Sequence, residues 1–356
     1  MKVAVYTIAL NEEQNVEKYL SSVAEADVVV ISDTGSTDGT IGAFRAGGAT
    51  VHEISVNPFR WEVARNASLA LVPSDVDVCL VLDLDDSLDE GWRDALETGW
   101  GDATIGRYKY VADQLPDGSD GTTYWGNRIH VRHGYRWVHP VYELLVADRI
   151  EESTAWLDIT MRSGRDQTKK RNYIEGLLLS RAESPDDPMP SRFLCRYYWG
   201  RRMWPEAEAA LRSDLELPAC SDRADSMRML GDACAHRGRA DEALQWWRRA
   251  VAEAPNSRQP WVSLAEALAG RTDWAGSYSA AMSALAIGAE QRVLQPTWAW
   301  RERPHLLASA AALELGMLEE SQRHAELAVA LAPGDQRVIA NLERAKNGTS
   351  SPPTSD

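Results

Sequence analysis

The local sequence pattern changes near residue 165, and this change limits what the chain can fold into. Before it, short runs rich in valine and isoleucine alternate with helical segments, whereas almost every later segment has helical spacing. Strands that alternate with helices predict a mainly parallel sheet with helices on both faces. We therefore expect an α/β unit over residues 1–165 and an all-helical unit over residues 166–346. Residues 347–356, rich in Ser, Thr and Pro, are expected to form a disordered tail.

The first unit carries enough local signal to place its elements. We expect strands at Val3–Leu10, Asp27–Ser32, Thr50–Val56 and Val76–Leu82, and helices at Glu13–Val23, Thr40–Ala46 and Trp61–Leu71. Pro73 should end the last of these helices. From Thr104 to Met161 the pattern changes to hairpins, with a turn signal at residues 117–121. The sheet should therefore be mixed, mainly parallel, with an antiparallel extension.

The helical half repeats with a period of about 34 residues. If Ala224 is the first position, Gly231 and Ala243 fall on the tetratricopeptide pattern, and Ala265 and Ser277 follow one period later. Small residues at these positions let paired helices approach closely and stack on their neighbours. This half is therefore predicted to be a tetratricopeptide-like repeat domain.

Composition excludes several classes of protein. The formal charge is −15, so the chain has no general electrostatic attraction to nucleic acid or to anionic lipid. No apolar run is long enough to cross a membrane, and the N-terminus leads directly into a strand instead of a signal peptide. The four cysteines form no C-x-x-C pair, which argues against a zinc site or a disulfide framework. A cytoplasmic location is expected.

Acidic and polar residues follow three of the predicted strands. Asn11-Glu12-Glu13 follows the first strand, residues 33–40 (DTGSTDGT) follow the second, and residues 83–86 (DLDD) follow the fourth. Ligands of open α/β sheets bind at the carboxyl ends of the strands, where these segments should meet. Clustered acids cost free energy unless a cation or a donor-rich ligand is present. A divalent metal that holds a diphosphate would explain the cluster.

The Asp83-Leu84-Asp85 segment is the sharpest part of this cluster. In an extended segment, residues two apart point the same way, so both carboxylates could face one ligand. Magnesium and manganese commonly take one or two protein carboxylates and complete their shell with water and phosphate oxygens. The alternative is a solvated acidic loop, but the position after an apolar strand favours a metal site.

These motifs together resemble a known family. Residues 7–13 (TIALNEE), 33–40 (DTGSTDGT), 64–66 (ARN) and 83–86 (DLDD) are similar, in order and spacing, to family-two glycosyltransferases of the GT-A fold. The helical repeats resemble those carried by a subgroup of that family. The resemblance implies a GT-A-type nucleotide-sugar-binding domain that binds a divalent metal, Mn²⁺ or Mg²⁺, and a nucleotide sugar with UDP as the expected nucleotide.

The resemblance also implies roles for individual residues. Asp33 should accept a hydrogen bond from the base, Arg65 should lie near the base and the diphosphate, Asp83 near the ribose or sugar, and Asp85 on the metal. The residues expected to bind the nucleotide sugar are Thr7, Ala9, Asn11, Glu12, Asp33, Arg65, Asp83 and Leu84. Asp38 is expected instead to cap the helix that begins near Thr40.

The sequence gives fewer indications about the residues that would bind the acceptor of the sugar. Transfer with inversion needs a general base, and Glu143 is the candidate, although it could simply pair with Arg136 or Arg128. Tyr142 occupies the place where related enzymes often have a histidine, which puts a histidine-based role in doubt. His139 could be a further metal ligand, but a structural role beside Pro140 is favoured. Trp125, Tyr135 and Trp137 could stack on a sugar.

The resulting hypothesis is a metal-dependent, inverting glycosyltransferase, of the hexosyltransferase class, with Glu143 and Asp85 as its catalytic residues. The repeats could recruit a protein or peptide acceptor, or only support the catalytic domain, and a homodimer is left open. The alternative is a non-catalytic tetratricopeptide scaffold or binding protein with a degenerate transferase domain. A dinucleotide-binding fold is excluded because no G-x-G-x-x-G turn follows the first strand. A nucleotidyltransferase is excluded because residues 7–13 contain no basic residue.

Overall fold

The computed structural model describes the chain apart from residues 116–117, 165–172, 218–219, 221, 289–296 and 349–356. The chain divides into two compact units, Met1–Glu183 and Ser184–Asp356. Most of the predicted C-terminal tail, residues 349–356, lies outside the described residues, as does part of the predicted turn at residues 117–121.

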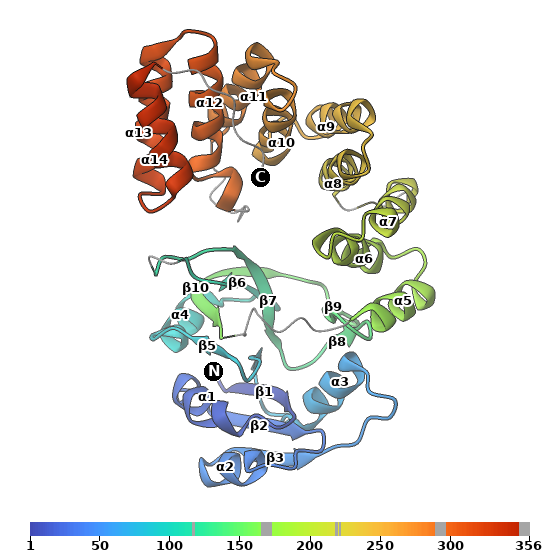
Figure 1. Cartoon of the computed structure of the whole chain (residues 1–356). Helices are drawn as coiled ribbons and strands as arrows, with labels where there is room; N and C mark the ends of the chain where they lie inside the picture. Colours follow the sequence, from blue (N-terminus) through green and yellow to red (C-terminus); the bar gives the residue numbers. More distant parts are fainter. Residues whose placement is uncertain (116–117, 165–172, 218–219, 221, 289–296, 349–356) are drawn as a thin grey trace. The chain divides into compact units, whose positions relative to one another are not determined.

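The first unit is a mixed sheet with helices on both faces (Figure 1). Its strand order is β3-β2-β1-β4-β7-β6-β10-β5, and β8 and β9 form a separate pair. The strands are β1 (Val3–Ala9), β2 (Val28–Asp33), β3 (Thr50–Glu53), β4 (Val78–Val81), β5 (Asp86–Leu88), β6 (Ile105–Val111), β7 (Thr123–Val131), β8 (Tyr135–Val138), β9 (Leu144–Ala147) and β10 (Thr154–Ser163). The helices are η1 (Glu13–Asn15), α1 (Val16–Ser22), α2 (Thr40–Ala46), α3 (Trp61–Leu71), α4 (Trp92–Gly99) and α5 (Ile174–Glu183).

The position of strand β1 in the sheet explains why its sequence is mostly apolar. Val3 and Val5 face one core, which includes Tyr19 of α1 and Phe44 of α2. Ala4 and Tyr6 face the opposite core, which includes Leu69 of α3. Because β1 pairs in parallel with both β2 and β4, it lies inside the sheet and is buried on both faces. Antiparallel pairing enters through β7, which joins β4 to β6. The predicted mixed sheet is confirmed.

The division between the units falls after α5, later than the predicted boundary at residue 165. Helix α5 packs on the first unit: a Cβ on Gly176 would lie 2.9 Å from Val141 Cγ1. At the end of the same helix, Glu183 accepts two hydrogen bonds from Arg60, each at 2.8 Å. Helical spacing alone could not show which unit this helix joins.

The second unit consists of helix pairs. They are α6 (Pro188–Gly200) with α7 (Trp204–Glu216), α8 (Arg223–His236) with α9 (Ala240–Glu253), α10 (Arg258–Ala269) with α11 (Trp274–Ala286), and α12 (Glu302–Glu314) with α13 (Leu318–Leu331), followed by α14 (Gln336–Asn347). The short η2 (Thr297–Ala299) precedes α12. Near its start, the second helix of each pair has a small residue that is completely buried: Ala207, Ala243, Ser277 and Ser321. The predicted helical repeats are confirmed.

A histidine pair, with His324 buried and His305 half-buried, links α12 and α13. His305 Nδ1 lies 3.0 Å from His324 Nδ1, and Arg323 Nη2 lies 3.2 Å from His324 Nε2. Because arginine only donates, His324 Nε2 accepts, and the His324 proton lies on Nδ1 toward His305. Burial, with smaller contributions from His324, Arg258 and Arg323, lowers the pKa of His305 from 6.5 to about 4. Burial and Arg323 also lower the pKa of His324, against the opposing effect of Glu320.

We expect the helical unit to lose stability in mild acid. Between about pH 4 and pH 6.5 the unfolded chain binds more protons at His305 than the folded chain, so stability falls as the pH is lowered. Allowing for partial exposure, the loss should be about 1–3 kcal/mol. Urea unfolding of the wild type and of His305→Gln at several pH values measures it. An equally steep loss in the variant would contradict this explanation.

Candidate functional site

The sheet places the ends of β1, β2 and β4 side by side, as the sequence predicts. Strand β1 pairs in parallel with β2 on one side and β4 on the other, so their carboxyl ends share one edge. Residues 10–15, 34–40 and 82–86 follow these ends, and Asp33 is the last residue of β2. This edge of the first unit is the first candidate site.

Near β1 and β2, several of the predicted ligand groups hydrogen-bond to residues of the adjoining loops. Asp33 accepts hydrogen bonds from the backbone of Gly35 and Ser36, at 2.9 and 2.8 Å, and from Ser36 Oγ at 2.5 Å. Asn11, with a φ of 54°, accepts at its Oδ1 from the Thr37 amide at 2.8 Å. The Asp33 carboxylate is thus enclosed by its own loop.

The other predicted binding residues of β1 take part in the same structure. The Ala9 carbonyl accepts from the Thr34 amide at 2.9 Å, and Thr7 is almost fully buried. The Glu12 amide donates to Thr40 Oγ1 at 2.8 Å, and the Glu12 carboxylate accepts from Asn15 at 2.6 Å. Asp38 accepts from the Thr40 amide at 3.0 Å, but the N-cap of α2 is Gly39, so Asp38 lies one residue before the predicted cap position.

A buried ion network lies between α3 and the end of β4. Arg65 donates from Nε to Glu143 Oε1 at 2.5 Å and from Nη2 to Asp83 Oδ1 at 2.6 Å. Arg128 donates to the other Asp83 oxygen at 2.7 Å, and the Arg65 guanidinium lies 5.1 Å from the Trp137 ring centroid. The structure therefore brings together Arg65, Asp83 and Glu143. Glu143 pairs with Arg65, whereas the sequence suggested Arg136 or Arg128.

The residues after β4 form a turn, and the predicted extended geometry is wrong. The Asp86 amide donates to the Asp83 carbonyl at 2.9 Å, which closes the turn, and Leu84 is buried in the core. Oxygens of Asp83, Asp85 and Asp86 still lie within 4.8 Å of one another. Burial, with Asp83 and Asp85, raises the pKa of Asp86 to about 7, and Tyr110 donates to its carboxylate at 3.1 Å.

This acid group fits a divalent cation poorly. Burial raises the pKa of Asp83, but Arg128 and Arg65 outweigh burial and leave it well below its usual range. Those two arginines already occupy both Asp83 oxygens. The structure does not bring His139 to the acids: its Nδ1 lies 3.1 Å from Ser180 Oγ on α5, and it is absent from the described acid group. Metal binding at Asp85 remains an untested prediction.

The second unit has a site that sequence reasoning missed. One stripe of α6 carries Arg192, Arg196 and Trp199. Arg192 donates to Asp222, the N-cap of α8, at 3.1 Å, while Arg196 donates to Asp225 at 2.9 Å and Trp199 donates to Asp232 at 3.2 Å, both on α8. One stripe of α8 carries Asp225, Arg228 and Asp232. Farther along the unit, Arg303 of α12 pairs with Glu266 of α10. We call these residues, together with Trp298 of η2, the first-helix row, because most lie on the first helix of a pair.

Arg228 is the centre of the first-helix row. Its guanidinium donates to Asp225 at 2.9 Å and to Asp232 at 3.0 Å. It also lies 5.4 Å from the Trp199 ring centroid and 5.8 Å from that of Trp298. Burial lowers the pKa of Arg228, but Asp225 and Asp232 outweigh burial and raise it overall. Trp298 also lies 5.2 Å from the Arg303 guanidinium, so the row runs without a break from α6 to α12.

Comparison with known proteins finds similarity only to solved structures. No family model matches the chain, and no curated protein matches it. Similar solved structures include PilF of Pseudomonas aeruginosa (11% identity, TM-score 0.41, 49% of this chain and 73% of that chain) and the type IV pilus biogenesis factor PilW (17%, 0.39, 48% and 73%). Another is YrrB, a TPR protein with an unusual peptide-binding site (14%, 0.39, 48% and 82%). These scores are low, so the function is argued below from the chain's own residues.

The comparisons contradict the resemblance to family-two glycosyltransferases. No family model or curated protein supports it, and the similar structures are tetratricopeptide proteins. The identification as an enzyme, and the assignment of a GT-A domain that binds a UDP-sugar, are wrong for the same reason. The geometry offers a physical reason: Asp83 is neutralised by two arginines and Asp33 is enclosed by its own loop. Among the described residues, no helix is long and apolar enough to span a membrane.

Proposed function

We propose that this chain is a non-catalytic binding protein whose helical unit recognises a segment of a partner protein through the first-helix row. The observation that carries the proposal is the continuity of the row. Arginine, carboxylate and tryptophan side chains contact one another from helix to helix across α6, α8, η2 and α12. Stacked helix pairs provide an extended surface of this kind for a bound segment.

The residue types in the first-helix row favour a role in binding rather than a role in stabilising the fold. Buried ion pairs are weak sources of stability, and apolar residues of similar volume often do as well or better. Arginine and tryptophan, by contrast, contribute most to the affinity of protein interfaces. Arg196 keeps 48% of its side-chain surface exposed while it contacts Asp225, so a partner can reach it. The row therefore offers ordered side chains of the types that dominate interfaces, with Arg196 accessible to a partner.

A peptide selection tests the proposal. Immobilised full-length protein should enrich members of a random-sequence peptide library, and a photoreactive version of an enriched peptide should attach to α6, α8 or α12. As a control, Asp85→Asn in the first unit should leave the affinity unchanged. Failure to enrich any peptide, or attachment confined to the first unit, would overturn the proposal.

A further inference from the structure

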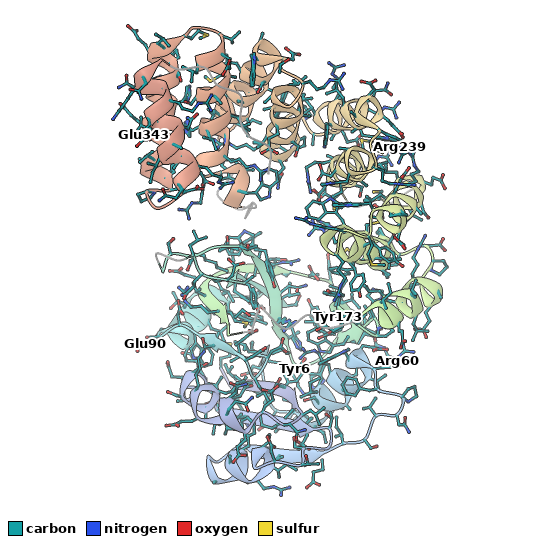
Figure 2. The ribbon with its side chains drawn as sticks, in the orientation of Figure 1. Tyr6, Arg60, Glu90, Tyr173, Arg239 and Glu343 are labelled. Carbon is teal, nitrogen blue, oxygen red and sulfur yellow. The ribbon has the colours of Figure 1, made fainter. Side chains whose placement is uncertain are left out.

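A second charged surface lies on α7, α9 and the turn before α9. It consists of Arg212 on α7, Arg237 in the turn, Arg239 at the start of α9 and Arg249 farther along α9, and we call it the arginine cluster. Figure 2 labels Arg239 within it. The cluster is distinct from the first-helix row, which lies mainly on α6, α8 and α12.

The cluster is built around a buried carboxylate. Arg212 donates from Nε and Nη2 to Glu208 Oε1, both at 3.0 Å, and Arg237 and Arg239 both donate to Glu208 Oε2. The Glu208 side chain is 9% exposed, whereas Arg212, Arg237 and Arg239 are 41%, 42% and 37% exposed. The acid therefore lies inside, and the guanidinium groups lie outside it.

A second acid and an aromatic ring extend the cluster. Glu242 accepts from Arg212 at 2.5 Å and from Arg239 at 2.9 Å. Trp246 lies beside two arginines: its ring centroid is 5.7 Å from Arg212 and 4.7 Å from Arg249. Three arginines thus bind two glutamates, and a fourth, Arg249, lies beside Trp246, so positive charges outnumber negative ones in the cluster although the chain's formal charge is −15.

The same geometry argues against a cation at this place. Glu208, Cys234 and Glu242 lie close enough to hold a metal ion. However, both glutamates already bind arginines, and a metal would have to displace those guanidinium groups. Burial raises the pKa of Glu208, but Arg239, Arg212 and Arg237 outweigh burial and lower it. The Glu208 carboxylate is therefore ionised, and both of its oxygens are hydrogen-bonded to arginines.

We infer that the arginine cluster is a docking surface for an acidic polypeptide segment. Each guanidinium has five N–H donors in a planar fork that matches a carboxylate. Arg237 gives Glu208 one hydrogen bond and Arg239 gives two hydrogen bonds to the two glutamates, so both retain outward donors. Arg249 is exposed beside Trp246, and among the described contacts it pairs with neither glutamate, so it adds a further positive charge. Aspartate or glutamate side chains of a partner would complete this set.

Binding of a labelled oligoglutamate peptide to the full chain tests the inference. At low salt the peptide should bind, an oligolysine peptide should not, and added salt should weaken the complex. Arg249→Glu should weaken binding about tenfold or more, while Arg323→Glu, a matched charge reversal on α13, should change it less than about twofold. Arg196→Glu in the first-helix row should also have little effect, which separates this inference from the proposed function.

Three results would overturn the inference. One is no binding of oligoglutamate at low salt. Another is equal weakening by Arg249→Glu and Arg323→Glu, which would indicate diffuse charge instead of a site. The third is complete displacement of the peptide by inorganic phosphate at the same concentration at which free glutamate displaces it. That result would indicate a site for small anions.

Discussion

Replacing Arg65 with methionine should lower the free energy of unfolding of the first unit by about 3–5 kcal/mol. Arg65 is almost fully buried and is the partner of both Glu143 and Asp83. Methionine fills much of the volume but leaves the Glu143 carboxylate, which is 9% exposed, without its 2.5 Å partner. An uncompensated buried charge is the largest single penalty that a substitution in this network can produce. Urea unfolding followed by circular dichroism measures the change.

A double variant identifies the cause. If the unpaired charge dominates, Arg65→Met combined with Glu143→Gln should cost less than the two single changes added together. Asp75→Asn serves as a control, because its pair with Lys2 is exposed and should contribute at most about 1 kcal/mol. Additive losses in the double variant would show that Arg65 acts mainly through its packing on Trp137.

Replacing Asp232 with alanine should destabilise the helical unit by about 2–4 kcal/mol. Both carboxylate oxygens are engaged: Oδ1 accepts from Trp247 at 3.0 Å, and Oδ2 accepts from Trp199 and Arg228. Removing the acid leaves Arg228 with Asp225 as its remaining carboxylate and leaves two indole N–H groups without their acceptor. Urea unfolding followed by circular dichroism measures this loss. Titration of a selected peptide should show weaker binding as well, because Trp199 and Arg228 lose their fixed positions.

Asp241 provides the matched control for this change. It lies on α9, it is 86% exposed, and it pairs with Arg271 at 2.8 Å. Exposed pairs contribute about 0–1 kcal/mol, so Asp241→Ala should be close to neutral. Similar losses for Asp232→Ala and Asp241→Ala would contradict the role of Asp232 as the acceptor that holds Trp199, Trp247 and Arg228.

Local pattern predicted much of the first unit. The helices Thr40–Ala46 and Trp61–Leu71 have the predicted bounds, because residue periodicity and Pro73 act over short distances. The strands β1, β3 and β4 lie inside their predicted ranges, and β2 extends one residue beyond its range, to Asp33. Helical repeats were also predictable, because close packing requires small residues at fixed positions such as Ala243 and Ser277.

The sequence alone could not predict which side chains far apart in the chain form pairs. Arg65 and Glu143 lie 78 residues apart, and nothing local shows that they pair. Asp83 and Asp85 were expected in an extended segment, but the Asp86 amide closes a turn there. The local composition could not show this, because an extended segment, a turn and a solvated loop can all be rich in aspartate. The first-helix row was missed because the repeat pattern specifies the residues that pack, whereas its exposed positions vary from one repeat to the next.

Titration of a selected peptide against wild type, Arg196→Glu and Arg323→Glu tests the proposed binding role most directly. Both variants reverse an exposed arginine that is paired with an acid, but only Arg196 belongs to the first-helix row. We predict that Arg196→Glu weakens binding about tenfold or more, with its helical circular dichroism unchanged, and that Arg323→Glu binds as the wild type does. Equal affinity in all three proteins would contradict recognition through the first-helix row.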